Sequence, residues 1–298
     1  RLVTLSAEDP RTGRATQVTP LALQRLTALG WPAIEVQQVE GWSVRFSSGI
    51  TRRANSVLST SMPRDPAEIS AAVDEVERRA AERWLAPTFQ VWQPASGTWP
   101  GSAAVPGPDG TAGEDDDFLE GQQRLADLLE RRGYESVAPT RVLWLGREDI
   151  PQHTAWDPRV GIAETLSDAW LDAHMGTSAD AIDPASRMVY RRLLAGGSSR
   201  FFDYPDEDGT LAAIAKLSIV HETPERSFGG VYAVKVRKDL RGRGMVGPII
   251  DAIFHHAVRM GLEGIWMQVE ERSEKALALA EDLGFTTAAR YRYLTRPA

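Results

Sequence analysis

The chain has 298 residues, of which 42% are apolar and 25% charged, a composition typical of a folded protein with one to three domains. Its formal net charge of −7 lacks the basic excess that drives binding to DNA or RNA, so we expect no nucleic-acid partner. The absence of cysteine excludes disulfides, thiolate-ligated zinc and an acyl-cysteine intermediate.

No apolar run is long enough to span a bilayer, and the first residues lack the apolar core of a signal peptide. We therefore expect a cytoplasmic protein without a membrane partner. The sequence begins at Arg1 rather than at methionine, so what precedes Arg1 is left open. The oligomeric state is open as well.

The first 150 residues predict an alternation of helices and strands. The patterns place a helix near 20–29, strands near 34–46 and 54–58, a charged helix over 66–82 and an apolar strand over 88–92. Residues 93–117, rich in Pro, Gly, Ser and Ala, end in three consecutive aspartates and predict a flexible loop with a solvated charge run. An amphipathic helix over 118–132, stopped by Gly133, and two short strands over 134–145 complete this block.

Towards the end of the chain the pattern predicts a strand, a helix and a second strand. Residues 231–236 alternate between two faces, and residues 264–269 are nearly all apolar, as in a strand covered on both faces. Between them Pro248 suits the first turn of a helix, and apolar pairs follow it at helical spacing. The prediction is a right-handed βαβ crossover.

The connection between this first strand and the helix is rich in glycine and arginine. Its glycines allow a tight turn whose N–H groups point at one spot, the helix N-terminus adds partial positive charge, and the arginines can pair with phosphate oxygens. We therefore predict a diphosphate site. Its residues are Arg241, Gly242, Arg243, Gly244, Met245, Val246 and Gly247.

In this position Arg241-x-x-Gly244-x-Val246 resembles the pyrophosphate loop, Gln/Arg-x-x-Gly-x-Gly/Ala, of the GCN5-related N-acetyltransferases (GNAT). Residues 269–285, which end in Leu-Gly-Phe, are similar to the second signature of that family. The resemblance implies acetyl-CoA as co-substrate and no metal. It adds Val234, Val236 and Ser273 to the cofactor site.

Three residues depart from the family pattern: Val246 stands for Gly or Ala, Ser273 for the frequent asparagine, and Ala280 for the tyrosine that often protonates the departing thiolate. The histidines show no metal spacing, so we expect no catalytic metal. Because cofactor binding tolerates these departures better than catalysis does, the alternative is a non-catalytic acyl-CoA-binding regulatory or sensor protein.

The two halves of the chain share a pattern. The helix, glycine and aromatic residue at 125–134 resemble those at 277–285, and residues 51–57 resemble the first lobe of an actinobacterial group of such transferases. We expect an α/β (α+β) fold of tandem GNAT-like lobes, each a twisted mixed sheet flanked by helices. A degenerate N-terminal lobe over 1–150, with the flexible loop 93–117, precedes an acetyltransferase domain over 157–298.

The resemblance implies an N-acetyltransferase that moves an acetyl group from acetyl-CoA to a primary amine of a small molecule or peptide, by direct transfer in a ternary complex. It also implies that a backbone N–H near Val234 to Val236 polarises the thioester carbonyl. Glu222, at the end of an apolar strand, is our choice of base, although its pattern equally suits a turn before Pro224, and Glu270 and Glu271 are alternatives. The acid is Tyr291, Tyr293, Ser273 or water, and the acceptor itself is not fixed by the sequence.

Overall fold

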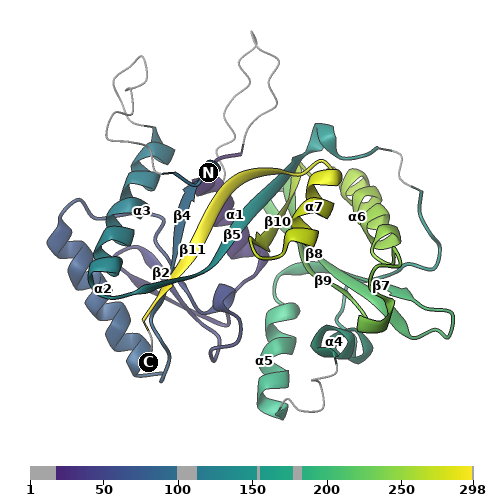
Figure 1. Ribbon diagram of the computed structural model, residues 1–298, viewed down its shortest axis with the longest axis horizontal. Helices are drawn as coiled ribbons and strands as arrows, with labels where there is room; N and C mark the ends of the chain where they lie inside the picture. Colours follow the sequence, from purple (N-terminus) through teal and green to yellow (C-terminus); the bar gives the residue numbers. More distant parts are fainter. Residues whose placement is uncertain (1–17, 99–112, 153–154, 177–182, 297–298) are drawn as a thin grey trace, which may run out of the picture. The chain divides into compact units, whose positions relative to one another are not determined.

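The computed structural model describes residues 18–98, 113–152, 155–176 and 183–296 (Figure 1). These residues form two compact units. Unit 1 contains Leu29–Pro32 and Trp144–Gln268, and unit 2 contains the residues up to Ala28, Ala33–Leu143 and the residues from Val269. The lobe boundaries expected from the sequence, 1–150 and 157–298, remain a proposal. They divide the chain into two similar halves in sequence order, whereas each compact unit combines segments from both halves.

Unit 2 begins with the helix α1, most of which belongs to it. Its helices are α1 (Pro20–Gly30), α2 (Pro66–Ala81), α3 (Glu114–Arg131) and α7 (Glu274–Asp282). Its strands are β1 (Glu35–Val39), β2 (Trp42–Phe46), β3 (Val57–Leu58), β4 (Thr88–Pro94), the first nine residues of β5 (Glu135–Gly146) and β11 (Thr286–Thr295). They lie in the order β1-β2-β3-β4-β11-β5.

The sheet of unit 2 joins strands that are far apart in the sequence. β11 pairs antiparallel with β4 over seven residues, from Ala289 opposite Pro94 to Thr295 opposite Thr88, while β3 pairs parallel with β4. Buried apolar side chains of α2 and α3 pack on this sheet, with Trp42 and Phe89 fully buried at its centre. The final strand of the chain thus belongs to the same sheet as the strands of the first hundred residues.

The helix α3 begins four residues earlier than the sequence pattern indicated. Residues 114–117, the acidic run expected in a loop, form its first turn, where carboxylates interact favourably with the positive end of the helix dipole. Asp115 Oδ1 also accepts a hydrogen bond of 3.1 Å from the N–H of Leu21 at the start of α1. The amphipathic pattern starts only at Phe118, so it could not indicate this turn.

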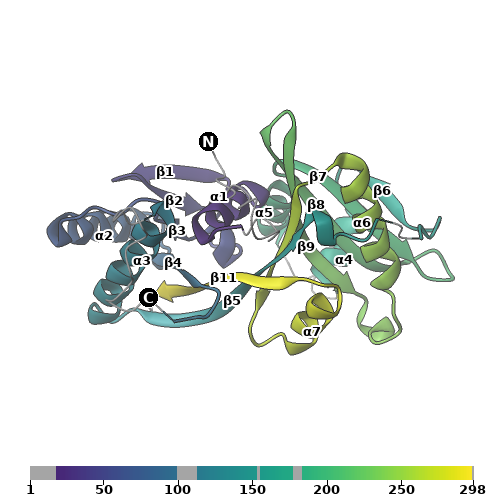
Figure 2. The ribbon, with the colours of Figure 1, turned by 90° about the horizontal axis from the view of Figure 1, so that it is seen from above.

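Unit 1 contains the predicted strand, helix and strand. Its helices are α4 (Asp168–Met175), α5 (Pro184–Leu194) and α6 (Gly247–Met260). Its strands are β6 (Gly161–Ala163), β7 (Ser198–Pro205), β8 (Leu211–Thr223), β9 (Arg226–Val236) and β10 (Gly264–Glu270, of which the first five residues belong to unit 1). The order is β10-β9-β8-β7-β6, with β10 parallel to β9 and the other pairs antiparallel (Figures 1 and 2).

Helices α4 and α6 cover opposite faces of this sheet. Adjacent residues of a strand point to opposite faces. On β7, the ring of Phe201 lies 5.2 Å from Trp170 of α4, and the ring of Phe202 lies 6.1 Å from His256 of α6. The crossover helix α6 therefore lies on one face of the sheet, and α4 covers the other. No helix in the described part of the chain is long and apolar enough to cross a membrane.

Candidate active site

The pairing of β8 with β9 is interrupted close to the predicted loop. Ile214 lies opposite Lys235, but Lys216 lies opposite Tyr232, so two steps along β8 face three steps along β9. The extra residue makes a β-bulge, and Ala233 has φ 52°, a left-handed conformation that residues other than glycine rarely adopt. A bulge releases backbone groups from the ladder, and this one lies beside Val234 to Val236, where the family resemblance implies a free N–H.

The segment after β9 turns tightly before it enters α6. Gly242 and Gly244 have φ 77° and 73°, and a Cβ at either position would meet nothing within 4 Å, so conformation rather than crowding requires glycine. Among the described residues, the N–H groups of Gly244, Met245 and Val246 have no hydrogen-bond acceptor. The helix that follows has no side-chain cap. These open donors at a helix N-terminus suit a phosphate group.

Charges around this turn are predominantly positive. Arg241 and Arg243 are exposed, and the Nε of Arg241 donates to the carbonyl of Val236 at 3.4 Å. The nearby carboxylate of Asp239 is held by Arg237 at 2.8 Å, and the hydrogen bond from this guanidinium lowers the pKa of Asp239. Because Arg237 offsets this negative charge, the two loop arginines are available to an anionic ligand.

The face of the sheet towards α4 carries an aromatic cluster at the bulge, which we define as Trp31, Tyr232 and Trp266. Trp266 Nε1 donates to Tyr232 Oη at 2.9 Å, and the rings of Trp31 and Tyr232 are 5.2 Å apart. Gly230 makes room for this cluster, since a Cβ there would lie 2.4 Å from Trp266. No sequence motif marks these three residues, because only the fold brings them together.

Glu222, the base chosen from the sequence, lies at the far end of β8 from the bulge. Its side chain is 4% exposed and forms an ion pair of 2.9 Å with Arg226, across the turn that joins β8 to β9. Eight residues separate it from Ile214, which corresponds to roughly 25 Å of extended strand. The structure thus does not bring Glu222 to the loop, and its role as base stays a prediction.

The other catalytic candidates belong to unit 2. Tyr291 and Tyr293 alternate onto one face of β11, with ring centroids 5.4 Å apart, and both are buried. Burial, followed by the neighbouring Tyr291, raises the pKa of Tyr293, which therefore stays protonated. Ser273 lies at the N-cap of α7 without making a side-chain cap hydrogen bond. Glu271, an alternative base, is bound by Arg290.

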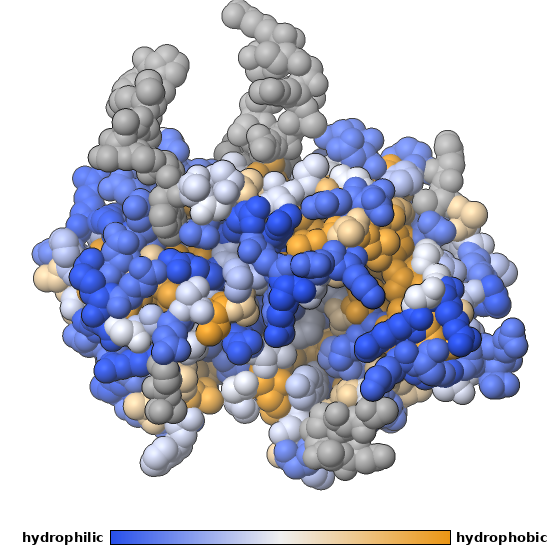
Figure 3. Space-filling model, viewed as in Figure 1, coloured by the Kyte–Doolittle hydropathy of each residue, from blue (hydrophilic) through white to orange (hydrophobic). Residues whose placement is uncertain are grey.

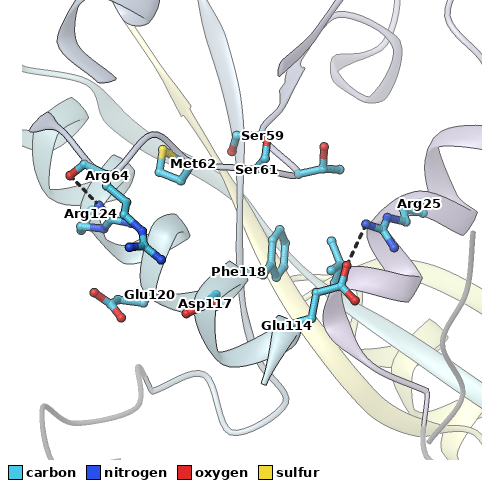
Figure 4. Close-up of a pocket in the computed structure, with 12 residues that line it drawn as sticks. Arg25, Ser59, Ser61, Met62, Arg64, Glu114, Asp117, Phe118, Glu120 and Arg124 are labelled. Atoms are coloured by element: carbon cyan, nitrogen blue, oxygen red, sulfur yellow. Dashed lines mark hydrogen bonds and ion pairs between the residues drawn. The ribbon is translucent and has the colours of Figure 1, made fainter. Parts of the chain in front are cut away.

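Unit 2 has a pocket of about 560 Å³ at the N-terminal end of α3 (Figure 4). Arg25 of α1 and Glu114 of α3 form an ion pair of 3.2 Å there, and Arg124 donates to the carbonyls of Pro63 and Arg64. The acidic first turn of α3 places carboxylates where a helix N-terminus would otherwise attract an anion. This helix end therefore does not suit a diphosphate as that of α6 does.

Residues 21–97 and 119–294 match the family model described as "Probable histone acetyltransferase Rv0428c C-terminal". The chain belongs to this family of acetyltransferases. Over 275 residues it is 22% identical to the "Uncharacterized N-acetyltransferase YobR" of Bacillus subtilis (strain 168), and the alignment covers 91% of the chain and 96% of that protein. It is 30% identical over 168 residues to a mycothiol acetyltransferase of Corynebacterium aurimucosum, covering 56% of the chain but about half, 48%, of that protein.

Solved structures show the same fold. A tandem GNAT protein from the clavulanic acid biosynthesis pathway superposes with a TM-score of 0.59 at 16% identity, covering 100% of this chain and 94% of that one. A GCN5-related N-acetyltransferase from Kribbella flavida gives 0.57 at 14% identity, covering 92% and 95%. The predicted superfamily and the tandem GNAT fold class are confirmed, and the protein is an acyl-CoA-dependent N-acyltransferase.

Within the described ranges, no three histidine, aspartate or glutamate side chains gather as they would around a metal ion. The absence of a catalytic metal stays a prediction.

On the face shown in Figure 3, unit 1 exposes apolar surface beside α6, bordered by hydrophilic residues.

Proposed function

We propose that the protein transfers the acetyl group of acetyl-CoA to a primary amine by direct attack in a ternary complex. The observation that carries the proposal is the glycine turn at the start of α6, next to the bulge in β9. Bound acetyl-CoA would supply an activated thioester. The chain would supply the binding donors, the electrostatic environment of the carbonyl and the paths for two protons.

The diphosphate would bind to the open N–H groups of Gly244, Met245 and Val246 and to the guanidinium groups of Arg241 and Arg243. Beside it, the bulge at Ala233 frees backbone from the ladder, and a free N–H of this segment can donate to the carbonyl oxygen as negative charge develops there. Both features come from backbone conformation. They therefore tolerate the departures from the family pattern at Val246 and Ser273.

The transfer forms a C–N bond between the amine and the acetyl carbon and breaks the C–S bond to CoA. The amine must give up a proton, and the departing thiolate must gain one. Glu222 as base and Tyr291 or Tyr293 as acid are the assignments predicted from the sequence. The variant Glu222→Gln removes the carboxylate, and with it the ion pair to Arg226, and so tests the first of these assignments.

The contacts of the glycine turn do not identify the class of amine that accepts the acetyl group. The name of the family model refers to histones, and several relatives are named for mycothiol. A first screen for thiol release would therefore include a histone-derived peptide as well as small primary amines. Activity with one of these acceptors would turn the proposed function into an assigned one.

Calorimetric titration with acetyl-CoA and CoA tests cofactor binding, with Gly244→Glu as the critical variant. A glutamate there would strain a positive φ and place a carboxylate against the diphosphate, so we expect binding to fall at least tenfold. Gly133→Glu is a matched control, because Gly133 also has a positive φ, 83°, and open space around it, but ends α3 in unit 2. Wild-type affinity in Gly244→Glu, or no binding by the wild-type chain, would contradict the proposal.

A further inference from the structure

The pocket of unit 2 lies between α1, α3 and the turn that follows β3, residues 59–64, and these elements are tied to one another. Arg25 of α1 pairs with Glu114 of α3 at 3.2 Å. The fully buried Gln122 of α3 accepts from the N–H of Trp92 at 3.0 Å and donates to the carbonyl of Ser59 at 2.7 Å. The walls are therefore fixed without a ligand, and the volume of about 560 Å³ is that of a small-molecule site.

Arg124, on the α3 side of this pocket, has no carboxylate partner among the described residues. Its Nη1 donates to the carbonyls of Pro63 and Arg64, at 3.2 and 3.3 Å, which holds the guanidinium group in place. Its Nη2 makes no hydrogen bond there and, unlike Nε, is not shielded from solvent. Figure 4 shows the side chain of Arg64 beside it. Two neighbouring guanidinium groups with open N–H donors are suited to an anion.

Negative charge lines the same pocket without neutralising Arg124. Asp117 and Glu120 belong to the lining, and neither forms an ion pair within the described ranges. Glu120 precedes Arg124 by four residues, the spacing at which a glutamate and an arginine stabilise a helix by pairing, but Arg124 is bound by the turn instead. Both signs of charge are thus left open to a ligand.

The turn after β3 adds uncharged donors to the pocket. The N–H groups of Thr60, Ser61 and Met62, which all line it, have no acceptor in the part of the chain that the structure describes. Phe118 and Leu21 add apolar surface. Backbone donors beside two arginines suit a carboxylate, and the apolar surface suits the uncharged middle of a ligand.

The spacing of the charges along α3 indicates the size of the ligand. A rise of about 1.5 Å per residue places Arg124 roughly 6 Å from Glu120 and roughly 10 Å from Asp117 along the helix axis. A dipeptide or tripeptide with free ends spans about 7–10 Å when it is extended. A single amino acid, whose two charged groups share one carbon atom, is too short to reach both.

From these contacts we infer that unit 2 binds a short peptide whose two ends are free and charged. The carboxylate binds to Arg124, Arg64 and the open N–H groups of the turn, and the ammonium group binds to Asp117 and Glu120. The acidic first turn of α3 does not oppose this, because the carboxylate lies further along the helix, at Arg124. The inference adds a second binding site to the proposed function and does not depend on acetyl-CoA.

Calorimetric titration of the full chain with three forms of trialanine tests the inference. The free peptide carries both charges, the N-acetylated peptide lacks the ammonium group, and the C-terminal amide lacks the carboxylate. We expect the free peptide to bind about tenfold more tightly, or better, than either blocked form. Equal affinity of a blocked form, or no binding of the free peptide at millimolar concentration, would overturn the inference.

Variants of the charged residues separate recognition of a charge from a structural role. In Arg124→Gln the free peptide and its amide should bind alike, and in Asp117→Asn/Glu120→Gln the free and N-acetylated peptides should bind alike. A merely structural role would weaken all three peptides equally. Arg131→Gln, at the exposed end of α3, is the matched control and should leave both preferences unchanged. An undiminished preference for the free carboxylate in folded Arg124→Gln protein would contradict the site.

Acetyl-CoA binding distinguishes the failure of this inference from the failure of the proposed function. Gly244→Glu should lose acetyl-CoA and still bind trialanine, whereas Arg124→Gln should keep its affinity for acetyl-CoA. Loss of both ligands in folded Gly244→Glu protein would mean that the peptide does not bind in unit 2, and would overturn the inference. A chain that binds trialanine but no acetyl-CoA would contradict the proposed function alone.

Discussion

Gly133 and Gly284 end two helices of unit 2 in the same conformation. Their φ angles are 83° and 95°, and in each case the next residue, Tyr134 or Phe285, donates its N–H to the carbonyl five residues back at 3.0 Å. This is the Schellman arrangement, which needs a left-handed residue after the helix. The likeness between 125–134 and 277–285 therefore extends from sequence to backbone geometry, as expected for two halves built on one plan.

Gly133→Ala should destabilise unit 2 by about 1 kcal/mol, because a Cβ is disfavoured at positive φ. A Cβ at Gly133 meets nothing within 4 Å, so the cost comes from the backbone alone. Urea unfolding followed by circular dichroism measures it. Gly247→Ala is the control: it also has open space, but its φ is not positive, and its stability should stay within about 0.5 kcal/mol of wild type.

Gly230→Ala should cost about 3 kcal/mol or more, since its Cβ would lie 2.4 Å from Trp266 and 2.6 Å from Tyr232. Combining it with Trp266→Leu opens space for the new methyl group. The double variant should lose less stability than the two single variants together, which a thermodynamic cycle of urea midpoints would show. Additive losses would mean that the cluster does not enforce glycine here.

Ala233 offers a test of the bulge. Ala233→Gly removes the strain of a positive φ and should preserve or raise stability, whereas Ala233→Val should lower it by about 1–3 kcal/mol. If the bulge frees the N–H that polarises the thioester, the valine variant should also have a lower kcat. The fold decrease in kcat should exceed the fold increase in KM. Retention of full kcat in a folded Ala233→Val protein would remove the bulge from the mechanism.

Arg237 should support cofactor binding without touching the cofactor. It holds Asp206 and Asp239, both at 2.8 Å, so Arg237→Gln leaves two carboxylates unbalanced beside the turn. We expect acetyl-CoA to bind roughly threefold to tenfold more weakly, with a steeper dependence on salt. Adding Asp239→Asn to Arg237→Gln should restore part of the affinity in the same titration, and no recovery would contradict the electrostatic explanation.

His174 should make unit 1 less stable in mild acid. The pKa of His174 is about 3 in the folded state, below its ordinary value of 6.5. Between these two pH values His174 is therefore protonated in the unfolded chain but not in the folded protein. The contribution of His174 is complete above pH 6.5 and is lost progressively down to about pH 3. His174→Phe and His174→Gln should both flatten the fall in unfolding free energy between pH 7 and pH 5, and an unchanged slope in both would count against this assignment.

The features that could be predicted from the sequence are those that short segments determine. The turn at 241–247, the crossover and the two glycine caps depend on neighbours within a few residues, and residue type alone indicates them. The aromatic cluster of Trp31, Tyr232 and Trp266 could not be predicted, because it depends on which residues of three separate segments come together. A single extra residue in β9 changes the register between β8 and β9, and no local sequence pattern indicates it.

Glu222 illustrates the same difference. The end of an apolar strand is a reasonable place for a catalytic carboxylate, but a strand has two ends, and only the topology shows that the cofactor turn follows β9 while Glu222 precedes it. Its ion pair with Arg226 explains how a nearly buried carboxylate is compensated there. The sequence shows that Glu222 carries a carboxylate at the end of a strand, but it does not show at which end of the sheet that carboxylate lies.

The ladder between β4 and β11 has a consequence for how the protein is made. Thr88 and Thr295, whose hydroxyl groups meet at 3.0 Å, are separated by 207 positions. During synthesis β4 must therefore wait, with one edge unpaired, while some two hundred further residues are translated, and closing so long a loop is slow. An unpaired edge recruits other strands, so nascent or shortened chains that lack β11 should be the forms that aggregate and depend on chaperones.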